Sequence, residues 1–280
     1  MAGGGLTPTG DCPTYDCAAL PTRTFAASPV GTLDGWAGNY GSFGFGWSVS
    51  RSSALRRRKV WLVLDVRGVG KSFGDVVVLA DVTFTVEPGE VVALTGVNGS
   101  GKSTLLRCIV GWDAFDTGQV LFEGNAFDEG RAAVRAAVAV GIEPGMDFSD
   151  LTVREHLEFM ARAHGNDTPD AIVGEVLDEL DLTVVADHFP FALSQGQQRR
   201  MGLASCFVRP RRLLILDEPE QNLDVQGRQW LAEKIRAERA AGVSVLMACH
   251  NPDLVARVAD SEVTLGWEPD DDLEPLEDQG

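Results

Sequence analysis

Hydrophobic and polar positions follow two different periods along this chain. Short runs rich in β-branched residues predict strands, whereas apolar residues that recur every three to four positions predict helices. On this basis, strands are expected at 60–66, 76–86, 91–94, 119–122, 138–142, 213–216 and 243–248. Helices are expected at 101–110, 153–163, 171–180, 194–208 and 225–239.

The order of these elements predicts the fold class. Strands and helices alternate in the first and last parts of the patterned region, as they do in parallel α/β proteins. Between about residues 145 and 210 the pattern is helical alone. We therefore expect an α/β protein with a parallel core and a helical insertion.

Both ends of the chain lack these periods. Residues 1–59 are rich in Gly, Ser, Thr, Pro and Ala, and we expect a disordered N-terminal extension. Its last part, the basic run at 56–59, is interpreted as a solvated linker in preference to a lipid-binding patch. Residues 268–280 form an acidic tail, which we expect to be solvated as well.

Composition narrows the classes of partner and the location. The net charge of −17 argues against nucleic acid, because a protein that binds a phosphate backbone needs a basic surface. No run reaches the roughly 18–20 apolar residues that span a bilayer, and no signal peptide is recognisable. We therefore expect a cytoplasmic protein.

The five cysteines fit that location. Cys108, Cys206 and Cys249 lie in apolar, periodic segments and are expected to be buried small hydrophobic residues. Cys12 and Cys17 have no second pair to complete a metal site. His156, His164 and His188 are expected to be structural or exposed.

The strongest chemical signal is a glycine-rich loop between a predicted strand and a predicted helix. It matches G-x-x-x-x-G-K-[ST], in which glycines let several backbone N–H groups point at an anion. Lys102 would bring a positive charge to the β- and γ-phosphates of ATP, and the Ser103 hydroxyl is placed to bind Mg²⁺. The residues expected to hold the nucleotide are Gly96, Val97, Asn98, Gly99, Ser100, Gly101, Lys102, Ser103 and Thr104.

A pair of carboxylates follows the apolar strand expected at 213–216. A strand of a parallel sheet delivers the residues at its carboxyl end to the edge where ligands bind. Asp217 would hold Mg²⁺ directly or through water, and Glu218 would polarise the attacking water as a general base. Together with the phosphate loop, this pair predicts ATP hydrolysis.

Further segments lie in a fixed order around these two motifs, and the whole series resembles the ATP-binding subunits of the ABC transporter family. The signature sequence of that family is matched at 193–197, its D-loop at 223–224, its switch histidine by His250 and its adenine-stacking aromatic residue by Phe73. The resemblance covers about residues 60–267. The additional nucleotide-binding residues that it implies are Ser194, Gln195, Gly196, Gln197 and Asp224.

The resemblance implies more than the residues alone predict. The fold would be that of a P-loop NTPase, with a parallel RecA-like core, an antiparallel β subdomain and the helical insertion. Two ATP-binding subunits, identical or different, would form a head-to-tail dimer with ATP between them. A separate membrane-spanning permease subunit would insert a short helix into a groove near 146–151, and the protein would be peripheral on the inner face of the cell membrane.

Two positions depart from the family pattern. Glu143 stands where a glutamine that contacts Mg²⁺ is expected, unless the alignment is shifted by a residue or two. Glutamate is also a Mg²⁺ ligand, but it adds negative charge beside ATP. Gln195 stands where the signature sequence usually has glycine, while Gly196 is retained.

Three functions are compatible with this set of motifs. The leading one is the ATPase subunit of a transporter, with export favoured because no further C-terminal domain follows the switch region. The second is a soluble ATPase of the same family that acts without a membrane partner. The third is a regulatory subunit that binds ATP only, which the presence of Glu218 and His250 argues against.

Overall fold

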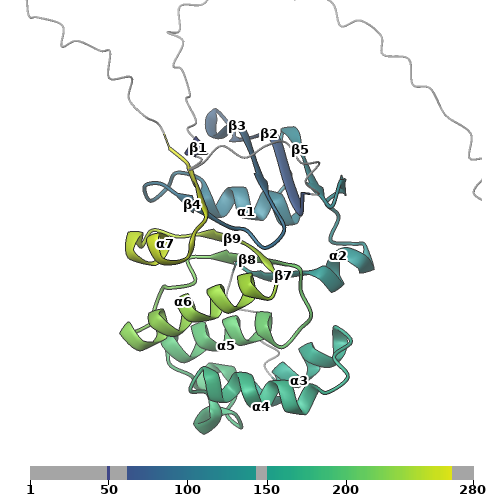
Figure 1. Cartoon of the computed structure of the whole chain (residues 1–280), viewed down its shortest axis with the longest axis vertical. Coiled ribbons are helices and arrows are strands. Elements are labelled where there is room, and N and C mark those ends of the chain that lie inside the picture. Colours follow the sequence, from purple (N-terminus) through teal and green to yellow (C-terminus); the bar gives the residue numbers. More distant parts are fainter. Residues whose placement is uncertain (1–48, 51–61, 143–149, 267–280) are drawn as a thin grey trace, which may run out of the picture. The chain divides into compact units, whose positions relative to one another are not determined.

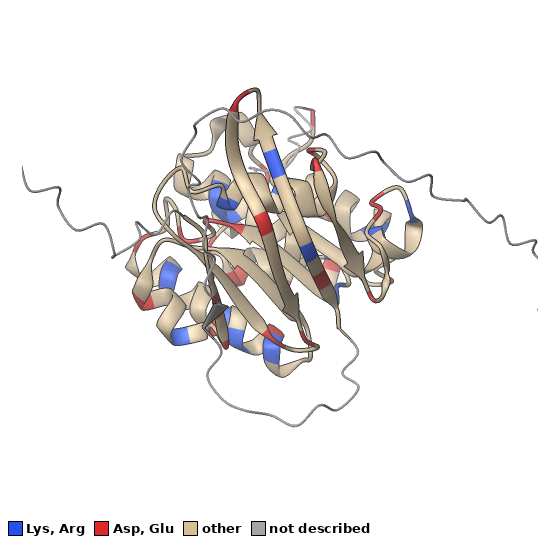
Figure 2. Ribbon diagram, turned by 90° about the horizontal axis from the view of Figure 1, so that it is seen from above, with Lys and Arg blue, Asp and Glu red and all other residues tan. Residues whose placement is uncertain are grey.

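The computed structural model describes residues 49–50, 62–142 and 150–266, all within the unit Gly44–Gly280. The expectations for most of 1–59, for Glu143 and for the acidic tail therefore lie outside the described residues. Among those that are described, no helix is long and apolar enough to cross a membrane. Basic and acidic positions are interspersed over its strands and helices (Figure 2).

A six-stranded sheet carries the core (Figure 1). Its order is β1-β10-β4-β9-β8-β7, with β1 antiparallel and the other five strands parallel. Along β8, Leu214 and Leu216 pack into one hydrophobic cluster, whereas Leu213 and Ile215 pack into another on the opposite face. Burial on both faces explains why β4, β8 and β9 are nearly continuous apolar runs in the sequence. The bounds are β1 Val49–Ser50, β4 Val91–Thr95, β7 Val138–Gly141, β8 Leu213–Asp217, β9 Ser244–Ala248 and β10 Ser261–Thr264.

A second sheet is antiparallel, in the order β3-β2-β5-β6. The expectation that its first strand ends at residue 66 is wrong, because β2 continues to Phe73. Its register against β3 shifts between Val66 and Val69 and again by Lys71, so irregularities carry the strand past two glycines. Those glycines had interrupted the apolar period. The bounds are β2 Leu64–Phe73, β3 Val76–Val86, β5 Thr117–Phe122 and β6 Asn125–Ala126.

Three helices between β7 and β8 make the expected helical insertion: α3 (Val153–Ala163), α4 (Pro169–Glu179) and α5 (Gln195–Phe207). Helices α3 and α5 each begin with a capping box, which satisfies two backbone N–H groups at each start. Their buried residues join the hydrophobic cluster of Leu214 and Leu216. The structure thus confirms a parallel core, an antiparallel sheet and a helical insertion packed on one face of the core.

The shortest elements were not expected from the sequence. They are α2 (Ala132–Ala137), α7 (Pro252–Val258), β1, β6, β10 and the 3-10 turns at Thr183–Val185 and Pro190–Ala192. A helix of six or seven residues is too short to show a period in a sequence window. The start of α7 is nevertheless marked, because Asn251 caps it and Pro252 occupies its first turn. The remaining helices are α1 (Lys102–Val110) and α6 (Val225–Ala240).

Candidate active site

The glycine-rich loop turns directly from β4 into α1. Gly96 has φ of +135°, and a Cβ there would lie 1.9 Å from the carbonyl oxygen of Leu265. Gly101 has φ of +92° and is the N-cap of α1, with no side chain to cap the helix. The first amides of α1 are therefore available to an anion, which is how helix N-termini bind phosphate.

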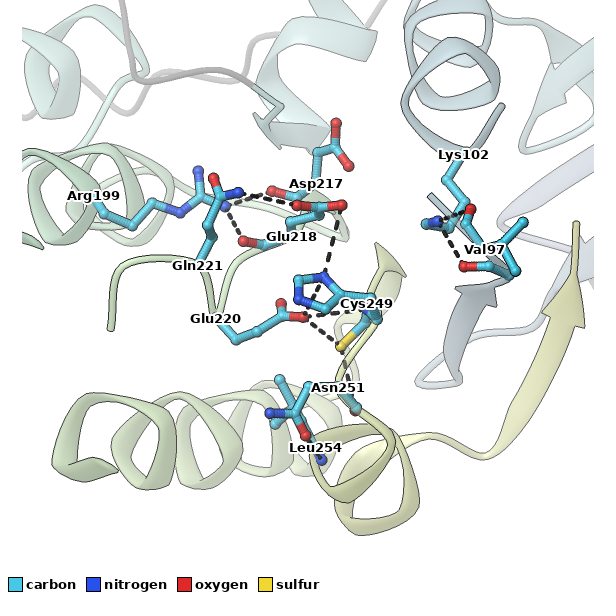
Figure 3. Close-up of polar contacts among 12 residues, drawn as sticks. Val97, Lys102, Arg199, Asp217, Glu218, Glu220, Gln221, Cys249, Asn251 and Leu254 are labelled. Carbon is cyan, nitrogen blue, oxygen red and sulfur yellow. Dashed lines mark hydrogen bonds and ion pairs between the residues drawn. The ribbon is translucent and has the colours of Figure 1, made fainter. Parts of the chain in front are cut away.

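Lys102 points back into this loop. Its Nζ donates to the carbonyl oxygens of Gly96 and Val97 at 2.9 and 3.0 Å, and the residue is 5% exposed. Figure 3 shows the ammonium group held against Val97. The ammonium group is thus held at the loop by two backbone carbonyls. Neither of these partners is a carboxylate that would neutralise it, so its positive charge is available to a phosphate.

A cavity of about 510 Å³ lies over the loop and joins the two main motifs. Glu218 and His250, which the sequence places far from the loop, border the same cavity as Lys102. The loop residues that line it are Asn98, Gly99, Gly101, Lys102, Ser103 and Thr104.

Asp217 ends β8 beside Ser103. Burial raises the pKa of Asp217, and a hydrogen bond with the Ser103 hydroxyl opposes the rise. Its Oδ1 is buried without a hydrogen-bond partner in the described part of the chain. A carboxylate oxygen in this situation is costly alone, and an oxygen-seeking divalent cation would relieve it. Asp217 and Ser103 therefore fit the Mg²⁺ site expected from the sequence.

Glu218 and His250 face each other across the ends of two neighbouring strands. Glu218 has a φ of +44°, and its backbone N–H donates to the carbonyl oxygen of Ala248 in β9 at 2.9 Å. The Nδ1 atom of His250 lies 3.7 Å from Oε1 of Glu218, and the imidazole is about half exposed. Gln221 donates to the other carboxylate oxygen of Glu218 at 3.3 Å. This places a carboxylate and an imidazole together at the mouth of the cavity.

Arg199 joins α5 to the backbone of Asp217 and Glu218. This residue was not identified from the sequence. Its Nη2 atom donates to the carbonyl oxygen of Asp217 and, at 2.6 Å, to that of Glu218 (Figure 3). The helix that begins at the signature sequence is therefore bonded to the backbone of the predicted catalytic residues. The only signal in the sequence for a role of this arginine is its position two residues after the signature match at 193–197.

The signature residues form the start of α5. Ser194 accepts from the backbone N–H of Gln197 at 3.3 Å, and the Gln197 side chain accepts from that of Ser194 at 2.9 Å, so Ser194 caps the helix. A Cβ on Gly196 would lie 3.2 Å from the carbonyl oxygen of Asn222. Gln195 borders a cavity of about 410 Å³ together with Ser103 and Asp217.

Asp224 is the N-cap of α6. Its side chain accepts from the backbone N–H of Gly227 at 2.8 Å and pairs with Arg200 of α5 at 3.2 Å. The predicted D-loop residue thus links α5 to the helix that follows β8.

Phe73 lies at the end of β2 and is 52% exposed, so it is not a core residue. The Nζ atom of Lys71 lies 5.0 Å from the centre of its ring. An exposed ring fits a stacking partner, so adenine stacking stays a prediction.

The structure also shows where three cysteines and one histidine named in the sequence analysis lie. Cys108, Cys206 and Cys249 are buried, as expected. His156 is 2% exposed and lies 3.4 Å from the Ser205 hydroxyl, which fits a structural residue.

The sequence of this chain matches the family model described as ABC transporter over residues 79–221. It is 35% identical over 203 residues to the Nod factor export ATP-binding protein I of Bradyrhizobium diazoefficiens, covering 71% of this chain and 66% of that protein. It is 31% identical to the SkfA peptide export ATP-binding protein SkfE of Bacillus subtilis, covering 72% of this chain and 85% of that protein. It is 33% identical to the spermidine/putrescine import ATP-binding protein PotA of Chromobacterium violaceum, covering 68% and 53%.

Solved structures give the same result. An ATP-binding subunit of an ABC transporter superposes with a TM-score of 0.67 at 31% identity, covering 72% of this chain and 85% of that one. A dimeric ATP-binding cassette bound to ADP and phosphate superposes with a TM-score of 0.66 at 22% identity, covering 72% and 94%, which supports the fold alone.

Proposed function

Since this chain belongs to the ABC transporter family as an ATP-binding subunit, we propose that it hydrolyses ATP and that this hydrolysis drives transport through a separate membrane subunit. The observation that carries the proposal is the shared cavity of the phosphate loop, Glu218 and His250. Glycines shape the loop, a buried lysine charges it, and a carboxylate and an imidazole face it. A site that only binds ATP has no need of the last two groups.

Each group has one part in the reaction. The first amides of α1 and Lys102 would hold the β- and γ-phosphates. Asp217 and Ser103 would hold Mg²⁺, which would supply positive charge beside the phosphates. Glu218 orients and polarises the attacking water, and His250 contacts the γ-phosphate. The protein accelerates the reaction by positioning and by electrostatic stabilisation.

We propose that two such subunits, identical or different, close head to tail over the nucleotide. The signature residues at the start of α5 would then face the phosphate loop of the partner subunit. Two apolar side chains support an association face on this part of the molecule. Val97 in the loop is 74% exposed, and Val225, directly after Asp224, is 72% exposed.

The groove expected near 146–151 lies mostly outside the described residues. Among the residues that are described, we propose an apolar cavity of about 520 Å³ as the place for the membrane subunit. Trp112 and Phe159 line it and are about half exposed. Arg135 and Arg209 also line it, and both guanidinium groups donate to backbone carbonyls. Burial first, and then these two arginines, lower the pKa of His164 in the same wall. A short helix with an apolar face and an acidic residue would complement this cavity.

Export is the favoured direction, because the relatives described above include two export subunits and one import subunit. The chain matches only 66% of the length of the first of these, so its cargo does not follow from theirs. The protein would then be peripheral on the cytoplasmic face of the membrane. An ATPase of this family that acts without a membrane partner is the second candidate, because the phosphate loop, Glu218 and His250, which would bind and hydrolyse ATP, include no residue of a membrane subunit.

Phosphate release from Mg²⁺-ATP tests the first part of the proposal. The wild-type chain should release phosphate, and Lys102→Met should lose at least about 90% of the rate, because the loop loses its charge. An unchanged rate in Lys102→Met, or no release by the wild type, would contradict it.

Co-expression with any multi-span membrane protein that is encoded beside this chain tests the second part. The two should purify together, and the complex should move its cargo across liposome membranes only with ATP. Absence of such a neighbour, together with full ATPase activity of the chain alone, would favour the second candidate.

A further inference from the structure

Glu220 is a buried carboxylate with no part in the nucleotide chemistry above. It lies in the turn between β8 and α6, and its side chain is 3% exposed. Its Oε1 accepts hydrogen bonds from the Cys249 thiol at 3.0 Å and from the backbone N–H of His250 at 3.3 Å. Its Oε2 is buried without a hydrogen-bond partner among the described residues. Burying a carboxylate oxygen without a hydrogen-bond partner costs folding free energy. The position of Glu220 beside His250 therefore calls for a functional explanation.

The same Oε1 atom lies 3.5 Å from Nδ1 of His250. Glu218 lies 3.7 Å from that nitrogen, so two carboxylates approach one side of the imidazole. Figure 3 shows Glu218 and Glu220 directed toward the same space beside Cys249. An ionised carboxylate only accepts hydrogen bonds. Two acceptors beside Nδ1 favour the tautomer in which that nitrogen carries the proton.

We propose that Glu220 is a positioning residue for His250: it holds the imidazole with the proton on Nδ1 and leaves Nε2 for the nucleotide. This rests on the proposed function, in which His250 contacts the γ-phosphate. When a phosphate oxygen faces Nε2, acceptors flank the ring on both sides, and the ring bridges them by donating from both nitrogens. The arrangement is the same in principle as a buried carboxylate that fixes the tautomer of a catalytic histidine.

The Cys249 thiol fits this arrangement. Burial first, and then the hydrogen bond to Glu220, raise the pKa of Cys249, so the thiol stays protonated and donates to the carboxylate. Two donors from consecutive residues thus fix Oε1 at the end of β9. The position of the carboxylate relative to the His250 ring is set by that strand and not by a flexible side chain alone.

A purely structural tether would make the same two hydrogen bonds without affecting the ring. The tautomer of His250 separates these roles. Long-range ¹H–¹⁵N correlation spectra of the nucleotide-free full chain at about pH 8.5, well above the ordinary imidazole pKa of about 6.5, report which nitrogen is protonated. The signals of His250 are identified by their loss in His250→Ala.

Wild-type His250 should carry its proton on Nδ1. In Glu220→Met only the more distant and more exposed carboxylate of Glu218 remains beside Nδ1, so the proton should move to Nε2, the form that a free imidazole prefers. In Glu220→Gln the side-chain carbonyl still accepts, so the Nδ1 form should be retained. A wild-type His250 protonated on Nε2, or a folded Glu220→Met that keeps the Nδ1 form, would overturn the proposal.

Kinetics provide the second readout. Glu220→Met should lower kcat roughly tenfold with ATP affinity within about twofold of the wild type, since the histidine is misplaced and the phosphate loop is untouched. The double variant with His250→Ala should be no slower than His250→Ala alone. If kcat of the double variant instead falls by the product of the two separate effects, the proposal is overturned.

Glu238 supplies the matched control, because it is also a buried glutamate, 7% exposed and paired with Arg211. Glu238→Met should lower thermal stability. In the double variant with His250→Ala, kcat should fall by the product of the two separate effects. If the wild-type chain neither binds nor hydrolyses ATP, the proposed function fails, and the tautomer spectra still decide the role of Glu220.

Discussion

At the scale of single residues, the phosphate loop depends on a position where no side chain fits. An alanine Cβ at Gly96 would lie 1.9 Å from the Leu265 carbonyl oxygen. Gly96→Ala should therefore destabilise the chain by roughly 1–3 kcal/mol and abolish ATP binding, measured by thermal unfolding and by a fluorescent ATP analogue. Gly174 is the control, because it lies within α4 with nothing within 4 Å. Gly174→Ala should leave ATP binding intact and stabilise by roughly 0.5–1 kcal/mol. Normal ATP binding by Gly96→Ala would refute the geometry of the loop.

Asp217 is expected to trade stability for function. Burial raises its pKa, so the ionised carboxylate costs folding free energy. That cost is absent below the pKa of the unfolded chain and complete above the pKa of the folded chain. At neutral pH, Asp217→Asn should raise the Tm of the nucleotide-free chain while Mg²⁺-dependent phosphate release is lost. A lower Tm would show that the carboxylate is stabilised by contacts other than those described.

The sequence predicts some of these residues and not others for a clear reason. The spacing around Lys102 and the strand before Asp217 and Glu218 are local patterns. The structure places Lys102 and Glu218 at one cavity and Asp217 at a second cavity, which shares Glu218 with the first. Glu220 and Arg199 gain their partners only through tertiary packing of β9 and α5. No local sequence pattern predicts such tertiary contacts.

At the scale of elements, α3 and α5 offer a matched pair, because each begins with a capping box. Ser194→Ala and Thr152→Ala should each cost about 1 kcal/mol of stability. Only Ser194→Ala should also slow ATP hydrolysis, because α5 begins at the proposed contact with the partner's nucleotide and carries Arg199. Equal rates in the two variants would remove the start of α5 from the active site.

Elements were predictable where a period extends over many residues. The expected helix at 153–163 coincides with α3, and the strand expected at 91–94 is β4 with one residue added. β2 was shortened in the prediction because its glycines break the period, although a bulged strand tolerates them. β10 was missed because only one of its four residues, Val263, is a buried apolar residue, whereas β4 is a continuous apolar run. α7 was missed because seven residues are too few to show a helical period.

At the scale of the whole molecule, charge opposes the proposed association of identical copies. Each chain carries a net charge of −17, so two copies repel at low ionic strength. A homodimer formed with ATP should tighten as salt rises from about 0.02 to 0.15 M, because screening shortens the reach of that repulsion. Sedimentation at both salt concentrations measures this. A dimer that weakens with salt would instead indicate complementary charges across the interface.

The most direct test of the whole account is the oligomeric state of Glu218→Gln with ATP. The amide cannot act as a base, so ATP should persist and hold two subunits together over the phosphate loops. Size-exclusion chromatography with light scattering should give twice the mass of the chain with Mg²⁺-ATP and the single mass without it, and phosphate release should fall by at least about a hundredfold. A variant that stays monomeric with ATP and hydrolyses it at the wild-type rate would contradict both the catalytic role of Glu218 and the composite site.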